Sequence, residues 1–194
     1  MFSANSIRLS IAPIAWTNDD IPELGGNIYF EQCIDEMAAA GFSGSEIGNK
    51  YPKDPAVLKP ALEQRKLQIS SAWFSTFFSE TGRTEETVSL FVEQMNFLKA
   101  MGAKVLNVCE CGHCVQGTPK HVFDRPSYTD QQWLQVAEGL NRIGEMAREN
   151  GMVIAYHYHM GTMVQNADET DRLMQMTDPD LVHQIGRASC RERV

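Results

Sequence analysis

The chain has 194 residues, enough for one sizeable hydrophobic core or for two small domains. Its hydrophobic fraction of 43% and its charged fraction of 22% are ordinary for a soluble globular protein. The formal net charge of -8 argues against nucleic acid and anionic membrane surfaces as general partners.

The sequence shows no membrane or export signal. No apolar run is long enough to span a bilayer, and the N-terminal segment MFSANSIRLS lacks the apolar core of a signal peptide. We therefore expect a cytoplasmic protein. The five cysteines are an odd number, and three of them crowd into the segment CECGHC, which is not typical of a disulfide framework. We interpret them as thiols in a reducing compartment.

Short apolar strands alternate with amphipathic helices along the chain. In order, the sequence predicts a strand at 8–16, a helix at 29–40, a strand at 43–49, a helix at 54–66, a strand at 67–75, a helix at 87–101, a strand at 104–110, a helix at 131–150, a strand at 152–159 and a helix at 167–177. Gly41, Gly102 and Gly151 each follow a helix, where the lack of a Cβ suits a left-handed C-terminal cap. Thr129 and Gln132 predict a capping box.

This alternation predicts an α/β fold with a parallel sheet. No G-x-G-x-x-G segment follows the first strand, which weakens a dinucleotide-binding sheet. Several unusual polar or aromatic residues lie late in the predicted strands, and a (β/α)8 barrel places its chemistry at those ends. Because such a barrel needs eight units and about 250 residues, we predict an incomplete (β/α)8 TIM barrel with about five βα units.

The last segment, QIGRASCRERV at residues 184–194, has neither helix nor strand periodicity. It is similar to the read-through translation of a common sequencing adapter. We therefore predict that residues 1–183 are the N-terminal part of a barrel and that residues 184–194 are a non-native tail. A genuine basic tail that binds a partner is the alternative.

Two histidines stand close together in the segment AYHYHMGTM. In a strand, alternate residues share a face and lie about 6.6 Å apart along the chain, so His157 and His159 are predicted to point the same way. Two imidazoles at a strand end could bind a metal or hold a substrate oxygen. The alternative is that one or both are buried and bonded to the backbone.

Glu110 ends the fourth predicted strand, and a carboxylate there is costly to bury unless it is paired. We consider it a candidate site residue, with an arginine partner as the structural alternative. The neighbouring Cys109, Cys111, His113 and Cys114 are zinc-ligand types, but their spacing lacks a second ligand pair. A structural zinc is therefore disfavoured.

A second group of candidates belongs to the first three strands. Glu46 lies at the end of its strand, and Asn49 and Lys50 follow on the rim, where they could bind hydroxyl groups. Trp16 and Trp73 could form an apolar floor for a flat ligand such as a sugar ring. Core packing of the tryptophans and a solvated lysine are the alternatives.

Five segments taken together resemble one family. They are IAPIAWTNDDIPELGG, SEIGNKYP, SAWFST, NVCECGHCVQG and AYHYHMGTMV. In this order they are similar to the strand-end motifs of the inosose dehydratases, which belong to the xylose isomerase-like barrel superfamily. The resemblance covers residues from about 7 to 183.

The resemblance implies a lyase of inositol catabolism that removes water from 2-keto-myo-inositol and leaves a trihydroxycyclohexane-dione. It also implies a divalent metal, manganese or cobalt, and a link to glutathione. His157, His159 and Glu110 would then be catalytic, and Trp16, Glu46, Asn49, Lys50 and Trp73 would bind the cyclic polyol ketone. An oligomer is compatible with the sequence.

The resemblance also implies that most metal ligands lie beyond residue 183. We therefore expect the chain alone to be an inactive fragment of low solubility. Two rival functions remain. One is a keto-sugar isomerase or epimerase of the same superfamily, and the other is a non-catalytic module that binds sugar or metal.

Overall fold

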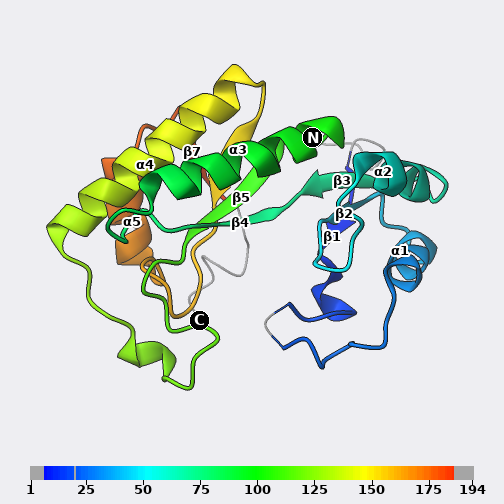
Figure 1. The fold of residues 1–194 in the computed structure, drawn as a ribbon, viewed down its shortest axis with the longest axis horizontal. Coiled ribbons are helices and arrows are strands. Elements are labelled where there is room, and N and C mark those ends of the chain that lie inside the picture. The colour runs from blue at the N-terminus through cyan, green and yellow to red at the C-terminus, as the bar shows by residue number, and fades with distance from the viewer. Residues whose placement is uncertain (1–6, 20, 186–194) are drawn as a thin grey trace. The chain divides into compact units, whose positions relative to one another are not determined.

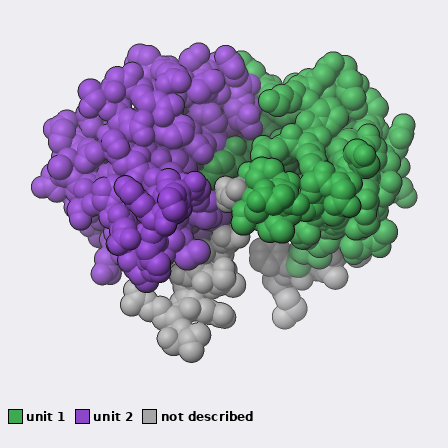
Figure 2. All heavy atoms as spheres, turned by 60° about the horizontal axis from the view of Figure 1, so that its bottom comes forward, with its two compact units in different colours: residues 1–73, 96–104 green, residues 74–95, 105–194 purple. Residues whose placement is uncertain are grey.

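The computed structural model describes residues 7–19 and 21–185. The chain divides into two compact units, coloured separately in Figure 2. Unit 1 comprises residues 1–73 and 96–104, and unit 2 comprises residues 74–95 and 105–194. Within the described ranges, no helix has both the length and the apolar character that a bilayer crossing requires.

Unit 1 contains a three-stranded sheet whose order is β1-β2-β3 (Figure 1). Both strand pairs are parallel. The elements of this unit are β1 (Ser10–Ile11), the short 3-10 helix η2 (Pro13–Ala15), α1 (Phe30–Ala39), β2 (Gly44–Glu46), α2 (Pro55–Glu63) and β3 (Gln68–Ser71).

The two helices of unit 1 form because apolar residues recur every three or four positions. In α1 this places Ile34 and Met37 in the core, and in α2 it places Leu58 and Leu62 there. Asp54 begins α2, since its carboxylate accepts a hydrogen bond of 2.8 Å from the backbone N–H of the second helical residue.

Unit 2 contains a four-stranded sheet whose order is β4-β5-β6-β7. The pairs β5/β6 and β6/β7 are parallel. Its elements are β5 (Val105–Glu110), the 3-10 helix η3 (Val122–Asp124), α4 (Asp130–Glu149), β6 (Val153–Tyr156), α5 (Ala167–Met176), β7 (Val182–Gln184) and all of β4 (Trp73–Thr76) except Trp73, which belongs to unit 1. Helix α3 (Thr84–Ala100) contributes to both units.

Helix α4 packs on β6 and β7 through a continuous apolar stripe. The predicted capping box at its start is confirmed, with Thr129 and Gln132 bonding reciprocally. Gly139 allows the helix to approach Phe78, because a Cβ at this position would lie 2.4 Å from the phenyl ring.

The predicted left-handed caps are also confirmed, with φ of +86° at Gly41, +80° at Gly102 and +69° at Gly151.

Three predicted strands have different limits in the structure. The strand predicted at 8–16 is short because residues 13–15 turn into η2, which begins at a proline that lacks a backbone donor. The strand predicted at 67–75 is divided into β3 and β4, which lie in different sheets. The strand predicted at 152–159 ends at Tyr156, since the N–H of His159 bonds Val164 within its own loop, at 3.1 Å.

The end of the described chain continues the sheet of unit 2. Strand β7 was not among the predicted strands, and it includes Gln184, the first residue of the predicted tail. Ile185 then donates its backbone N–H to the carbonyl of Tyr156 at 3.0 Å. The rest of the predicted tail, residues 186–194, lies outside the described residues, and its foreign origin stays a prediction.

Candidate functional site

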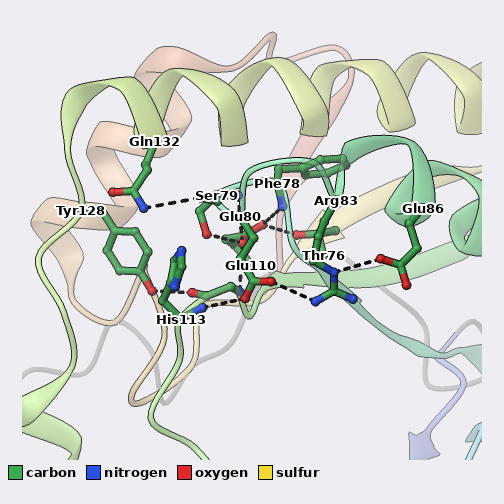
Figure 3. A network of polar contacts seen from close by, with 11 residues as sticks. Thr76, Phe78, Ser79, Glu80, Arg83, Glu86, Glu110, His113, Tyr128 and Gln132 are labelled. Carbon is green, nitrogen blue, oxygen red and sulfur yellow. Dashed lines mark hydrogen bonds and ion pairs between the residues drawn. The ribbon is translucent and has the colours of Figure 1, made fainter.

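Glu110 is the last residue of β5 and is fully buried. Five donors surround its carboxylate (Figure 3). Oε2 accepts from Thr76 Oγ1 at 2.7 Å and from the Phe78 N–H at 3.0 Å. Oε1 accepts from the N–H of Ser79 at 3.3 Å, from its hydroxyl at 2.8 Å and from the Gly112 N–H at 3.0 Å. Hydroxyl and backbone donors, rather than the arginine considered above, hold this carboxylate.

Burial is the largest influence on the Glu110 carboxyl and raises its pKa. The hydroxyls of Thr76 and Ser79 and the backbone donors lower the pKa and offset part of this effect. With three bonds on one oxygen and two on the other, the carboxylate is well satisfied by the protein itself. This geometry favours a structural anchor, so the catalytic role of Glu110 stays a prediction.

The imidazoles of His157 and His159 lie beside each other just after β6. Their ring centroids are 5.9 Å apart with the planes tilted by 59°. The N–H of His157 extends the ladder by donating to Val108 of β5 at 2.8 Å. The Nδ1 of His159 lies 3.2 Å from the carbonyl of Met160. The rings are therefore adjacent, as expected, although the second histidine is placed by a folded loop and not by a strand.

Two tyrosines alternate with these histidines, Tyr156 before His157 and Tyr158 between the two. Tyr156 is fully buried, and its hydroxyl accepts a hydrogen bond of 3.3 Å from the Glu110 N–H. Burial raises the pKa of this phenol well above its usual range. The hydroxyl oxygen of Tyr158 is buried and has no hydrogen-bond partner among the described residues. Such an unsatisfied group is uncommon in a core and is a candidate for interaction with a ligand.

In unit 1, Glu46 is the last residue of β2 and is half-buried. The hydroxyl of Ser71 in β3 donates to its Oε1 at 2.8 Å. The register shifts by one residue between Ser45 and Glu46, which pairs Glu46 with Ser71. Asn49 follows in an exposed turn. The predicted placement of both residues at the exit of the second strand is confirmed.

Lys50 is exposed and holds a neighbouring loop of unit 1. Its ammonium group donates to the carbonyls of Gly25 at 2.8 Å, Gly26 at 3.0 Å and Ile28 at 2.7 Å. An ammonium group has three donors, so these bonds use its full capacity. Its role in substrate binding stays a prediction, and the geometry adds a structural role that the sequence did not indicate.

The two predicted tryptophans differ in their settings. Trp16 is half-buried after η2, and its indole N–H donates to Oε2 of Glu36 at 2.6 Å. Trp73 is 37% exposed and begins β4, so the expectation that it lies late in its strand is wrong. The cause is the break at Ala72, which divides the predicted strand.

Thr76, Ser79 and Tyr128 were not among the predicted site residues. The first two bind Glu110, and the Tyr128 hydroxyl donates to the Gly112 carbonyl at 2.6 Å. The sequence carried one signal for Thr76 and Ser79, the hydroxyl residues of the segment FSTFFSE, which begins within β4 and continues beyond its end. The role of these hydroxyl donors is recognisable only in the folded protein, where they lie next to the buried carboxylate of Glu110.

No group of three His, Cys, Asp or Glu side chains that could hold a metal ion occurs in the described ranges. The cysteines of the CECGHC segment and Cys33 are present as thiols.

Comparison with known proteins gives a consistent result. Residues 34–184 match the model of the xylose isomerase-like TIM barrel family. An inosose dehydratase of Bacillus cereus (strain AH820) is 54% identical over 94% of this chain and 61% of its own length. An inosose dehydratase of Lacticaseibacillus casei is 58% identical over 91% of this chain and 60% of its own length. The chain thus spans about three fifths of the relatives it matches.

Solved structures share the fold at low sequence identity. A xylose isomerase-like TIM barrel protein from Mycobacterium smegmatis, in complex with magnesium, has a TM-score of 0.68 and 16% identity, covering 94% of this chain and 65% of that one. A probable 3-DHS dehydratase from Bacillus anthracis has a TM-score of 0.66 and 14% identity, covering 91% of this chain and 61% of that one. With its parallel strands and five described helices, the chain has the predicted α/β class. It belongs to the xylose isomerase-like TIM barrel family.

Proposed function

We propose that this chain is part of a dehydratase that removes water from a cyclic polyol ketone, with 2-keto-myo-inositol as the substrate and a trihydroxycyclohexane-dione as the product. The observation that carries the proposal is 54–58% identity to inosose dehydratases over 91–94% of the chain. The pair of adjacent imidazoles after β6 supports it, because proton transfer is the central requirement of this reaction.

The chemistry follows from the ketone. A carbonyl acidifies the proton on the neighbouring carbon, so a neutral imidazole can abstract that proton. The hydroxyl on the next carbon then leaves as water when a second group protonates it. We assign these two proton transfers to His157 and His159, whose rings lie 5.9 Å apart. The hydroxyl of Tyr158, whose oxygen is buried and has no hydrogen-bond partner among the described residues, is a third donor in this loop.

In unit 1 the proposed role is recognition of the substrate. Glu46 and Asn49 offer an acceptor and an amide at the exit of β2, and these groups suit the hydroxyls of a polyol. The exposed part of Trp73 offers an apolar face for a ring. Trp16 and Lys50 complete the proposed set, while each also bonds within its own unit.

A divalent ion, manganese or cobalt, belongs to the proposal only through the family resemblance. The Mycobacterium smegmatis relative is in complex with magnesium. The described residues do not form a three-ligand site by themselves, so no step above depends on an ion. The activity assay tests the ion and glutathione separately, by leaving out one of them at a time. Thermal unfolding of the protein, followed as manganese or cobalt is added, tests metal binding independently of activity.

The proposal is tested with the chain alone and with a chimera that completes it with the part of the Lacticaseibacillus casei relative that it does not match. We expect the chimera to release one water per turnover from 2-keto-myo-inositol, and the chain alone to be inactive. His157→Ala or His159→Ala in the chimera should reduce kcat by at least about 100-fold, the usual effect of losing an acid or base. His121→Asn is the control, since it keeps an acceptor at the start of η3.

Each other outcome points to a different function. Conversion of the ketone into an isomer without loss of water identifies a keto-sugar isomerase or epimerase. Tight binding of the ketone without turnover identifies a sugar-binding module. Unchanged turnover in both histidine variants would show that the two imidazoles are not the proton-transfer groups, whatever the reaction.

A further inference from the structure

Cys111, Gly112, His113 and Cys114 form a tight turn directly after β5. The backbone N–H of Cys114 donates to the carbonyl of Cys111 at 3.2 Å. His113, at the third position, has a left-handed φ of 56°. In a turn closed by such a bond, the first and fourth Cα atoms lie within about 7 Å. A disulfide spans about 4.4–6.8 Å between Cα atoms, so the Cα separation that this turn imposes on Cys111 and Cys114 is compatible with a disulfide after rotation of the side chains.

The two thiols are also more accessible than the other described cysteines. Cys111 and Cys114 are half-buried, whereas Cys33 is 1% and Cys109 is 0% exposed. A small reagent can therefore reach the turn without opening the core. Because of this difference in exposure, a small reagent should react with Cys111 and Cys114 before it reacts with Cys33 or Cys109.

The turn is fixed by hydrogen bonds from several elements (Figure 3). The Gly112 N–H donates to the buried Glu110 carboxylate at 3.0 Å, and the Gly112 carbonyl accepts from Tyr128 at 2.6 Å. The His113 N–H donates to Oε1 of Glu80 at 3.2 Å. Because both central residues are held by the protein, closing a bond between the two cysteines orders little additional backbone.

We propose that Cys111 and Cys114 are a redox-active pair that exchanges with small disulfides. One thiolate attacks a small disulfide, forms a mixed disulfide and releases one small thiol, which takes up the proton lost by the protein thiol. The second cysteine then displaces the second small thiol and closes the Cys111–Cys114 bond. Two protein thiols are oxidised and one small disulfide is reduced to two thiols. This pairing is independent of the proposed dehydratase activity.

The electrostatic setting favours a pair that keeps its disulfide over one that donates it. Burial raises the pKa of the Cys114 thiol, and a charge on Cys111 raises it further. The reduced form therefore gains little from a thiolate at Cys114. Strongly oxidising pairs are those whose thiolate is stabilised, and this turn is of the opposite kind. Exchange by Cys114 should accordingly become faster as the pH rises toward the raised pKa of its thiol.

The test equilibrates the full chain with mixtures of 2-mercaptoethanol and hydroxyethyl disulfide, blocks the remaining thiols and maps the peptides by mass spectrometry. We expect the peptide with Cys111 and Cys114 to lose two hydrogen atoms and both alkylation sites, while Cys33 and Cys109 stay reduced. Alkylation of the turn should be at least about tenfold faster than alkylation of Cys33, which needs a local opening of the core.

Three comparisons make the result decisive. The same mixture with the chain unfolded in urea should require at least about tenfold more disulfide, because the fold raises the effective concentration of the pair. Cys111→Ser and Cys114→Ser should each stop at the mixed disulfide, while Cys33→Ser should oxidise like the wild type. Bonds between Cys109 and Cys111 or between chains, or equal oxidation in the folded and unfolded states, would overturn the proposal.

Discussion

Replacing Glu110 by glutamine tests how the buried carboxyl stabilises unit 2. The side chains have the same shape, but an amide nitrogen cannot accept a hydrogen bond. Oε1 has two backbone donors, from Ser79 and Gly112, so the amide nitrogen is best placed at Oε2. There it faces the Thr76 hydroxyl and the Phe78 N–H. The hydroxyl can rotate, whereas the backbone N–H is left unsatisfied.

One buried, unsatisfied N–H costs about 1–3 kcal/mol. We therefore expect Glu110→Gln to lower the free energy of unfolding by about 2 kcal/mol at a pH below 4.5, the ordinary carboxyl value. There the native side chain is a neutral acid, whose two oxygens still accept bonds from all the surrounding backbone donors. Glu110→Ala leaves all five donors without the carboxyl and should cost about 3–5 kcal/mol.

The pH dependence of this difference has a definite sign. Burial raises the folded-state pKa of Glu110, so its contribution is complete below the unfolded pKa and is lost as the pH rises through the folded pKa. Glutamine has no such titration. The stability gap between the wild type and Glu110→Gln should therefore be largest at acidic pH and narrow toward neutral pH.

The assay is urea unfolding followed by circular dichroism at several pH values, together with hydrogen exchange of the Phe78 amide, which should accelerate in the variant. Glu138→Gln on the exposed face of α4 is the control and should change stability by less than about 0.5 kcal/mol. A stability gap that widens as the pH rises would show that the hydrogen-bond donors lower the pKa of Glu110 by more than burial raises it. Unchanged stability of Glu110→Gln at every pH would refute the inference that the five hydrogen bonds to the Glu110 carboxylate stabilise the unit.

Two further predictions concern packing and the loop of unit 1. Gly139→Ala places a Cβ 2.4 Å from the Phe78 ring, so overpacking should cost about 1–3 kcal/mol in thermal unfolding; a neutral effect would mean that the ring moves freely. Lys50→Met removes three bonds to the backbone of residues 25–28, and amide exchange there should accelerate while Lys53→Met leaves it unchanged. Equal exchange in both variants would contradict the anchoring role.

The helices were predictable because their signals are local. Apolar spacing, the capping pair at Thr129 and the glycines after three helices all lie within a few residues of the boundaries that they set. The adjacency of His157 and His159 was predictable for a similar reason, since residues two apart along an extended chain remain near each other. The predicted limits of the strands were less accurate. A strand ends where its hydrogen bonds to the neighbouring strand end, and that neighbour lies far away in the sequence.

By itself, the sequence determined the alternation of strands and helices, the α/β class and most of the candidate residues near strand ends, since periodicity and turn residues encode these locally. Only the tertiary structure decided what surrounds each candidate. Glu110 meets donors from residues 31 to 34 positions earlier in the chain, and the ammonium group of Lys50 meets the carbonyls of a loop more than twenty residues before it. A hydrogen bond forms only within a few tenths of an ångström of its ideal length, and distances between remote segments are fixed by the packing of the whole unit.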